Sequence, residues 1–109
     1  MAEFRGSQNR RAQTLLNFRV DGTGTASIVD GGGDAALTDN GTGDYTLTFT
    51  ERFAAVPTVV GTGVTGTDDF IVTIASVTET AVNIVTKDDA GAAEDAAFHL
   101  MVVGTREPF

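Results

Sequence analysis

Few side chains in this sequence could carry out acid–base or nucleophilic chemistry. His99 is the only histidine, Lys87 is the only lysine, and cysteine is absent. Catalysis by proton transfer would therefore depend on carboxylates. These occur as adjacent pairs at Asp68–Asp69, Asp88–Asp89 and Glu94–Asp95. Each pair stands in a turn-rich segment, where Asp is common because its side chain bonds the backbone. We predict no catalytic residues and no enzyme.

The motifs that mark nucleophiles, metal sites and phosphate sites are missing as well. The sequence contains no G-x-S-x-G, no H-E-x-x-H and no G-x-x-x-x-G-K-[ST]. Carboxylates that could bind calcium occur in "DGTGT", "DNGTGD" and "DDAGAAED", but none of these has the D-x-[DN]-x-[DN]-G spacing of a calcium-binding loop. We therefore expect acidic turns without a metal, and no cofactor.

His99 has two interpretations. It could be a metal ligand or a pH switch on a symmetry axis where copies of its strand meet. Alternatively, it is a hydrogen-bonded histidine in a contact between subunits, and this second interpretation is favoured. A site for sugar rings has little support, because Trp is absent and the only tyrosine, Tyr45, is in phase with the apolar residues Leu47 and Phe49. That phase predicts a core position for Tyr45.

Apolar residues recur at period 2, and Gly, Asn and Asp interrupt the chain every few residues, which predicts strands rather than helices. The segment 90–97 has some helical propensity but is expected to be a loop. About eight short antiparallel strands indicate an all-β fold, a jelly-roll-like β-sandwich. The expected strands are Thr14–Val20, Gly24–Asp30, Asp34–Thr38, Asp44–Thr50, Pro57–Thr65, Asp69–Val77, Thr80–Lys87 and Ala96–Thr105.

Two of these strands are apolar on both faces. Behind the apolar residues of 69–77 stand Ile71 and Ala75, and behind those of 96–105 stand His99, Met101 and Val103. A strand with one solvated face should carry polar residues there. A second apolar face indicates a subunit interface, predicted to contain Ile71, His99, Met101 and Val103. A central strand covered by a loop is the alternative.

The charge of the chain is unevenly distributed. Its 109 residues carry a net charge of −8, and 41% of them are apolar, as in globular proteins. Residues 1–13 form a basic arm with Phe4, Arg5, Arg10 and Arg11, whereas residues 14–109, the predicted sandwich domain, are strongly acidic. An acidic body repels phosphate backbones, so we expect no nucleic-acid partner for it. No apolar run is long enough for a membrane helix, and no membrane partner is expected.

Several segments of the chain resemble a β-module of tailed bacteriophages, common in marine phages. They are "LNFRVDGTGTASIVD", "ALTDNGTGDYTLTF", "FAAVPTVVGTG" and "EDAAFHLMVVG", which together cover about residues 16–104. The resemblance implies a compact sandwich that forms a homotrimer at the tip of a tail fibre or elsewhere on the virion surface. It implies no catalytic residues. In phages the module normally follows a long shaft of repeats, whereas only a short arm precedes the first strand here.

From the resemblance and the short arm we expect a structural virion protein, assembled in the cytoplasm of a host bacterium. The arm would dock on the major capsid protein or a tail protein, with Arg5, Arg10 and Arg11 pairing with acidic groups and Phe4 inserted as an apolar anchor. Capsid decoration, as a cement protein, is favoured over a fibre tip. The alternative is a receptor-binding module that recognises a host surface glycan through loops such as Asp30–Asp34 or Asp88–Asp95.

Overall fold

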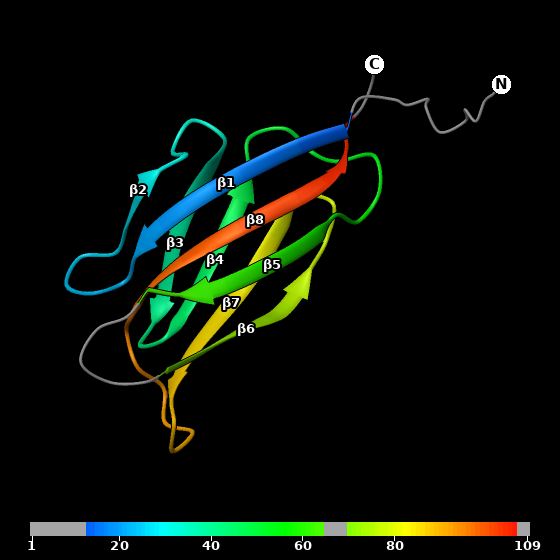
Figure 1. Cartoon of the computed structure of the whole chain (residues 1–109). Helices are drawn as coiled ribbons and strands as arrows, with labels where there is room; N and C mark the ends of the chain where they lie inside the picture. Colours follow the sequence, from blue (N-terminus) through cyan, green and yellow to red (C-terminus); the bar gives the residue numbers. More distant parts are fainter. Residues whose placement is uncertain (1–12, 65–69, 107–109) are drawn as a thin grey trace, which may run out of the picture.

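The chain folds into two packed four-stranded antiparallel sheets in a computed structural model that describes residues 13–64 and 70–106 (Figure 1). Sheet A has the strand order β2-β1-β8-β5, and sheet B has the order β3-β4-β7-β6. The strands of sheet A are β1 (Gln13–Asp21), β2 (Ser27–Asp30), β5 (Thr58–Gly63) and β8 (Ala97–Thr105). Those of sheet B are β3 (Ala35–Gly41), β4 (Asp44–Phe49), β6 (Phe70–Val77) and β7 (Ala81–Asp88).

The predicted all-β fold and antiparallel sandwich are confirmed, while the strand order does not confirm a jelly roll in particular. The segment 90–97 is largely a loop, as expected. Most strand boundaries differ from the sequence prediction, and three of the differences bear on the arm and the turns. Gln13, placed in the arm, begins β1 and pairs with Thr105. β2 begins three residues late, after a turn with Gly24 at φ +64°. β3 continues to Gly41, because a bulge after Asp39 lets the hairpin turn be very short.

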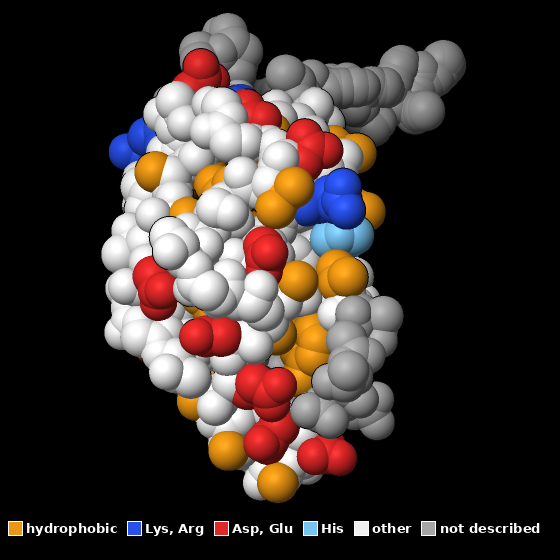
Figure 2. Space-filling model, turned by 90° about the vertical axis from the view of Figure 1, so that its left-hand side faces the viewer, with side chains coloured by type: hydrophobic (Ala, Val, Ile, Leu, Met, Phe, Trp, Pro, Cys, Tyr) orange, Lys and Arg blue, Asp and Glu red, His pale blue; other side chains and the backbone are white. Residues whose placement is uncertain are grey.

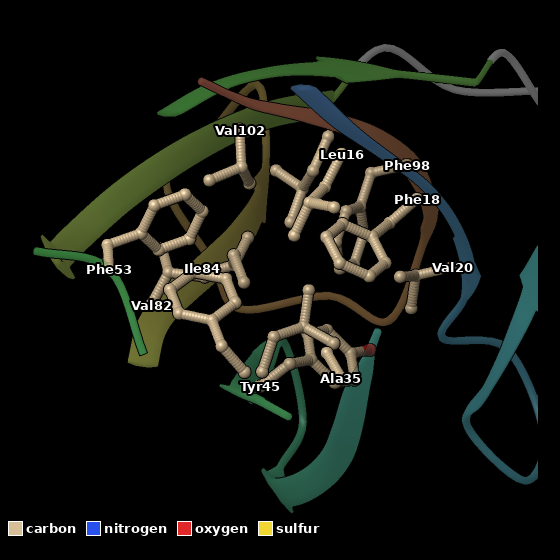
Figure 3. Close-up of a cluster of buried hydrophobic side chains, with 13 residues drawn as sticks. Leu16, Phe18, Val20, Ala35, Tyr45, Phe53, Val82, Ile84, Phe98 and Val102 are labelled. Carbon is tan, nitrogen blue, oxygen red and sulfur yellow. The ribbon is translucent and has the colours of Figure 1, made fainter. Parts of the chain in front are cut away.

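The core lies between the sheets and is made by the period-2 alternation of the strands (Figure 3). Tyr45, Leu47 and Phe49 of β4 point inward as predicted, and Tyr45 is fully buried. The Tyr45 and Phe98 rings lie 5.5 Å apart between centroids, which joins the two sheets. The remaining buried apolar side chains of this cluster are Leu16, Phe18, Val20, Ala35, Phe53, Val82, Ile84, Leu100 and Val102.

Glycine is required at the β3–β4 turn. Gly43 has φ +67°, and a Cβ atom there would lie 2.4 Å from the Thr86 carbonyl oxygen. The turn can therefore pack closely on β7, and the Thr86 N–H donates to the Gly43 carbonyl at 2.8 Å. This explains why the "DNGTGD" segment is a sharp hairpin signal.

Candidate functional site on the outer face of sheet A

The outer face of sheet A carries the side chains that alternate with the core residues of β1, β8 and β5. The register places them in rows across the strands. The first row contains Leu15, Val103 and Thr58, the second Asn17, Met101 and Val60, and the third Arg19, His99 and Thr62. Asp30 of β2 extends the third row, because it is the partner of Arg19. We call this surface the outer face of sheet A.

The first two rows are mainly apolar and open to solvent. Leu15 is 56% exposed, Val60 59% and Met101 46%. Val103 lies between Leu15 and Thr58 and is half-buried. Exposed apolar side chains are common one at a time, but neighbouring ones on one sheet face mark an interaction surface.

The third row is polar and borders a hollow of about 380 Å³. The side chains that line it come from all four strands of the sheet: Asn17, Arg19, Asp30, Val60, Thr62, His99 and Met101. Arg19 Nε donates a hydrogen bond to His99 Nε2 at 3.3 Å. In Figure 2 the histidine, drawn in pale blue, has a basic side chain directly above it and a hydrophobic one below. Because His99 accepts at Nε2, its proton belongs on Nδ1.

The hollow thus joins two kinds of surface. Its second-row side chains, Met101 and Val60, offer hydrocarbon, and its third row offers hydrogen-bond donors and acceptors. A volume in the range of ligand pockets, with an apolar part and a few polar groups, is the usual composition of a small-molecule site.

The structure separates the four residues predicted for the subunit interface. His99, Met101 and Val103 share the outer face of sheet A. Ile71 pairs with Lys87 at the edge of sheet B and is 55% exposed there, so it does not share a face with the other three. The predicted arm residues Phe4, Arg5, Arg10 and Arg11 lie outside the described residues.

Apart from Ile71 on the edge strand β6, the outer face of sheet B carries polar side chains that bond one another. The Asn83 amide donates to Asp44 Oδ1 at 2.9 Å and to the Tyr45 carbonyl at 2.7 Å. Asn40 of the edge strand donates to Thr46 Oγ1 at 2.8 Å. Cross-strand hydrogen bonds of this kind stabilise a sheet and leave few free groups for a ligand.

The acidic loops use their carboxylates on the backbone. Asp39 Oδ1 accepts the Gly41 N–H at 3.0 Å, and Asp88 Oδ1 accepts the N–H groups of Ala90 and Ala92, both at 2.9 Å. Asp95 is more than a turn residue: its Oδ1 accepts the Gly43 N–H and the Tyr45 hydroxyl, each at 2.8 Å. Within residues 13–64 and 70–106 no three His, Cys, Asp or Glu side chains are grouped as metal ligands.

Sequence reasoning missed Arg19, Asp30, Asn17 and Thr62 as members of one site. The alternation of β1 placed Asn17 and Arg19 opposite the core, so their orientation was available from the sequence. Their neighbours were not, because β8 is about 80 residues away along the chain.

In comparisons with known proteins, the chain matches no family model, no curated protein and no solved structure. In the part of the chain that the structure describes, no helix is long and apolar enough to cross a membrane.

Proposed function

We propose that the chain is a structural protein of a tailed-phage virion, which assembles as a homotrimer through the apolar rows of the outer face of sheet A. The observation that carries the proposal is the contrast between the two outer faces. Leu15, Met101 and Val60 are exposed side by side on sheet A, whereas on sheet B the outer side chains of β3, β4 and β7 include polar groups that bond one another, and the exposed Ile71 stands on the edge strand β6. Burying the apolar rows against another copy would remove this apolar area from water.

The virion location is supported by the sequence resemblance and by the acidic body. Copies that repel each other at their outer surfaces keep particles dispersed. In this proposal the arm, with Phe4 and its three arginines, docks on the major capsid protein or on a tail protein. Capsid decoration remains the favoured role, with the tail as the alternative location.

The proposed subunit contact is tested by the mass of the purified chain in solution, measured by light scattering. We expect three times the mass of one chain. Leu15→Asp should reduce the mass to that of a monomer, because it places a charge among the exposed apolar side chains of the contact. Thr48→Asp is the matched control on the outer face of sheet B, where Thr48 is exposed, and it should leave the mass unchanged. A wild-type monomer, or equal effects of both substitutions, would refute the contact.

The docking role is tested separately with particles. Deleting residues 1–11 should abolish attachment to virions and leave the mass in solution unchanged. Full occupancy by the truncated protein would refute the arm as anchor, without bearing on the subunit contact.

A further inference from the structure

We propose that the hollow on the outer face of sheet A binds a neutral carbohydrate, one or two sugar residues in size. This inference goes beyond the proposed function and does not depend on it. It also differs from a glycan site in the loops, because the side chains involved stand on strands. A site on strands is held more precisely than one on loops.

The first argument is the alternation of donors and acceptors along the third row. Asp30 can only accept hydrogen bonds, Arg19 can only donate them, and Thr62 can do both. Asn17, at the border of the hollow, likewise offers both a donor and an acceptor. A hydroxyl group donates and accepts at once, so it can bridge Arg19 and Asp30. A ligand with several adjacent hydroxyl groups fits such a row better than any group that only donates or only accepts.

The second argument is charge. Arg19 and Asp30 are Cα partners and both line the hollow. No ion pair within 4.0 Å joins these two described residues. Their charges nevertheless offset each other, because both lie on the border of one small hollow. An anion would be repelled by Asp30 and a cation by Arg19, so the balanced pair favours a neutral polar ligand.

The third argument is the apolar border. Met101 and Val60 offer exposed hydrocarbon next to the polar row. A sugar ring can contact both kinds of surface, because it has C–H groups on its face and hydroxyl groups around its edge. Met101 is well suited to this contact, because its flexible, polarisable side chain adapts to irregular surfaces.

The sugar site and the proposed subunit contact share the second-row side chains Met101 and Val60, but they are centred on different rows of the face. Leu15 and Arg19 are four residues apart on β1, which corresponds to about 13 Å along the strand. A contact centred on Leu15 and Val103 therefore leaves the Arg19–His99 row at the far end of the same face.

The test is a titration of the full chain, labelled with ¹⁵N, with glucose, galactose, mannose and N-acetylglucosamine, followed by NMR. We expect at least one of these sugars to cause saturable chemical-shift changes. They should be concentrated in the amides of Asn17, Arg19, Asp30, Thr62 and His99. Asp30→Ala and Arg19→Met should each weaken binding at least tenfold. Asp89→Ala, in an exposed turn that does not line the hollow, is the matched control and should bind like the wild type.

The competing ligand chemistry is tested in the same experiment. N-acetylneuraminic acid and acetate serve as anionic probes, and shifts that require the anion would overturn the neutral-ligand assignment. Shifts confined to the loops 30–34 or 88–95, or no saturable shift with any of the four sugars, would overturn the site itself. Light scattering on the Asp30→Ala variant keeps the two proposals apart, because loss of sugar binding with an unchanged mass concerns only the hollow.

Discussion

The outer faces of the two sheets differ in how their side chains are satisfied. On sheet B, Asn83 and Asn40 bond side chains and backbone of neighbouring strands. On sheet A, the one side-chain hydrogen bond of the described third row joins Arg19 to His99, and apolar side chains stand open beside it. The polar groups of sheet B therefore stabilise the fold, whereas sheet A has exposed groups that can contact another molecule. The difference predicts where substitutions will unfold the protein and where they will change its interactions.

The largest effect on folding is expected at Asp95, whose carboxylate holds the end of sheet B to the loop before β8. Asp95→Ala removes the partner of the Gly43 N–H and the close partner of the Tyr45 hydroxyl, which keeps only the Gly22 carbonyl at 3.3 Å. Leaving buried donors unpaired should lower the free energy of unfolding by about 3 kcal/mol. Urea denaturation measures this effect.

Glu94→Ala is the matched control for this substitution. Glu94 contacts Thr86 through its main chain, with its N–H donating to the Thr86 carbonyl at 3.1 Å. Its side chain can be removed without breaking that bond, so a change within about 0.5 kcal/mol is expected. A control as destabilising as Asp95→Ala would show that acidity of the loop, rather than the Asp95 contacts, is what matters.

A second large effect is expected at alkaline pH through Tyr45. Burial, together with the hydrogen bond and the charge of Asp95, raises the pKa of the Tyr45 hydroxyl far above its ordinary value of 10.0. Above pH 10.0 the unfolded chain loses this proton while the folded chain keeps it, so ionisation stabilises the unfolded state relative to the folded state. Stability should be unaffected by this group below pH 10.0 and fall steeply above it.

Tyr45 is the only tyrosine and Trp is absent, so tyrosinate absorbance reports this one group. We expect the absorbance to rise together with the loss of circular dichroism, because the hydroxyl ionises when the sheets separate. Tyr45→Phe should be less stable than the wild type at neutral pH. Its free energy of unfolding should change little above pH 10.0, so that the stability curves of the two proteins converge there. Ionisation in the intact fold would contradict the buried bond to Asp95.

A smaller effect is expected where the two faces are compared directly, at two asparagines. Asn83→Ala removes the amide bonds to Asp44 and to the Tyr45 carbonyl and should cost about 1.5 kcal/mol. Asn17→Ala on the outer face of sheet A truncates an exposed side chain of the same type, and a change within about 0.5 kcal/mol is expected. Equal costs in urea denaturation would remove the distinction between the faces.

The fold was largely predictable because its information is local. The alternation of Tyr45, Leu47 and Phe49 with threonines fixes which face of β4 is buried, whatever the strand pairs with. The same alternation placed His99 and Met101 outward on β8. The predicted strand boundaries were wrong where a bulge or a glycine with positive φ determines the turn, as at Gly24 and after Asp39.

The candidate site was only partly predictable because its information is non-local. Alternation gives the face of each residue within its own strand but not the sheet to which the strand belongs. Ile71 and Met101 therefore seemed equivalent in the sequence, although β6 and β8 lie in different sheets. The row of Asp30, Arg19, His99 and Thr62 exists only once β2, β1, β8 and β5 are placed side by side.

The smallest effect is expected at Asp21, at the end of β1 in sheet A, whose carboxylate makes local bonds only. The Thr23 hydroxyl and then the Thr23 N–H donate to Asp21 Oδ1 and lower the pKa of this carboxyl below its ordinary value of 3.8. The bonds therefore contribute stability that is present above pH 3.8 and is lost as the pH falls through the lower, folded-state pKa.

Asp21→Asn should slightly lower the melting temperature at neutral pH, with the difference from the wild type vanishing in acid. Asp89→Asn, in an exposed turn, should show no such pH-dependent difference. Because the Asp21 bonds span two residues and cross no strand, an effect as large as that of Asn83→Ala would mean that sheet A, too, depends on its polar groups for stability.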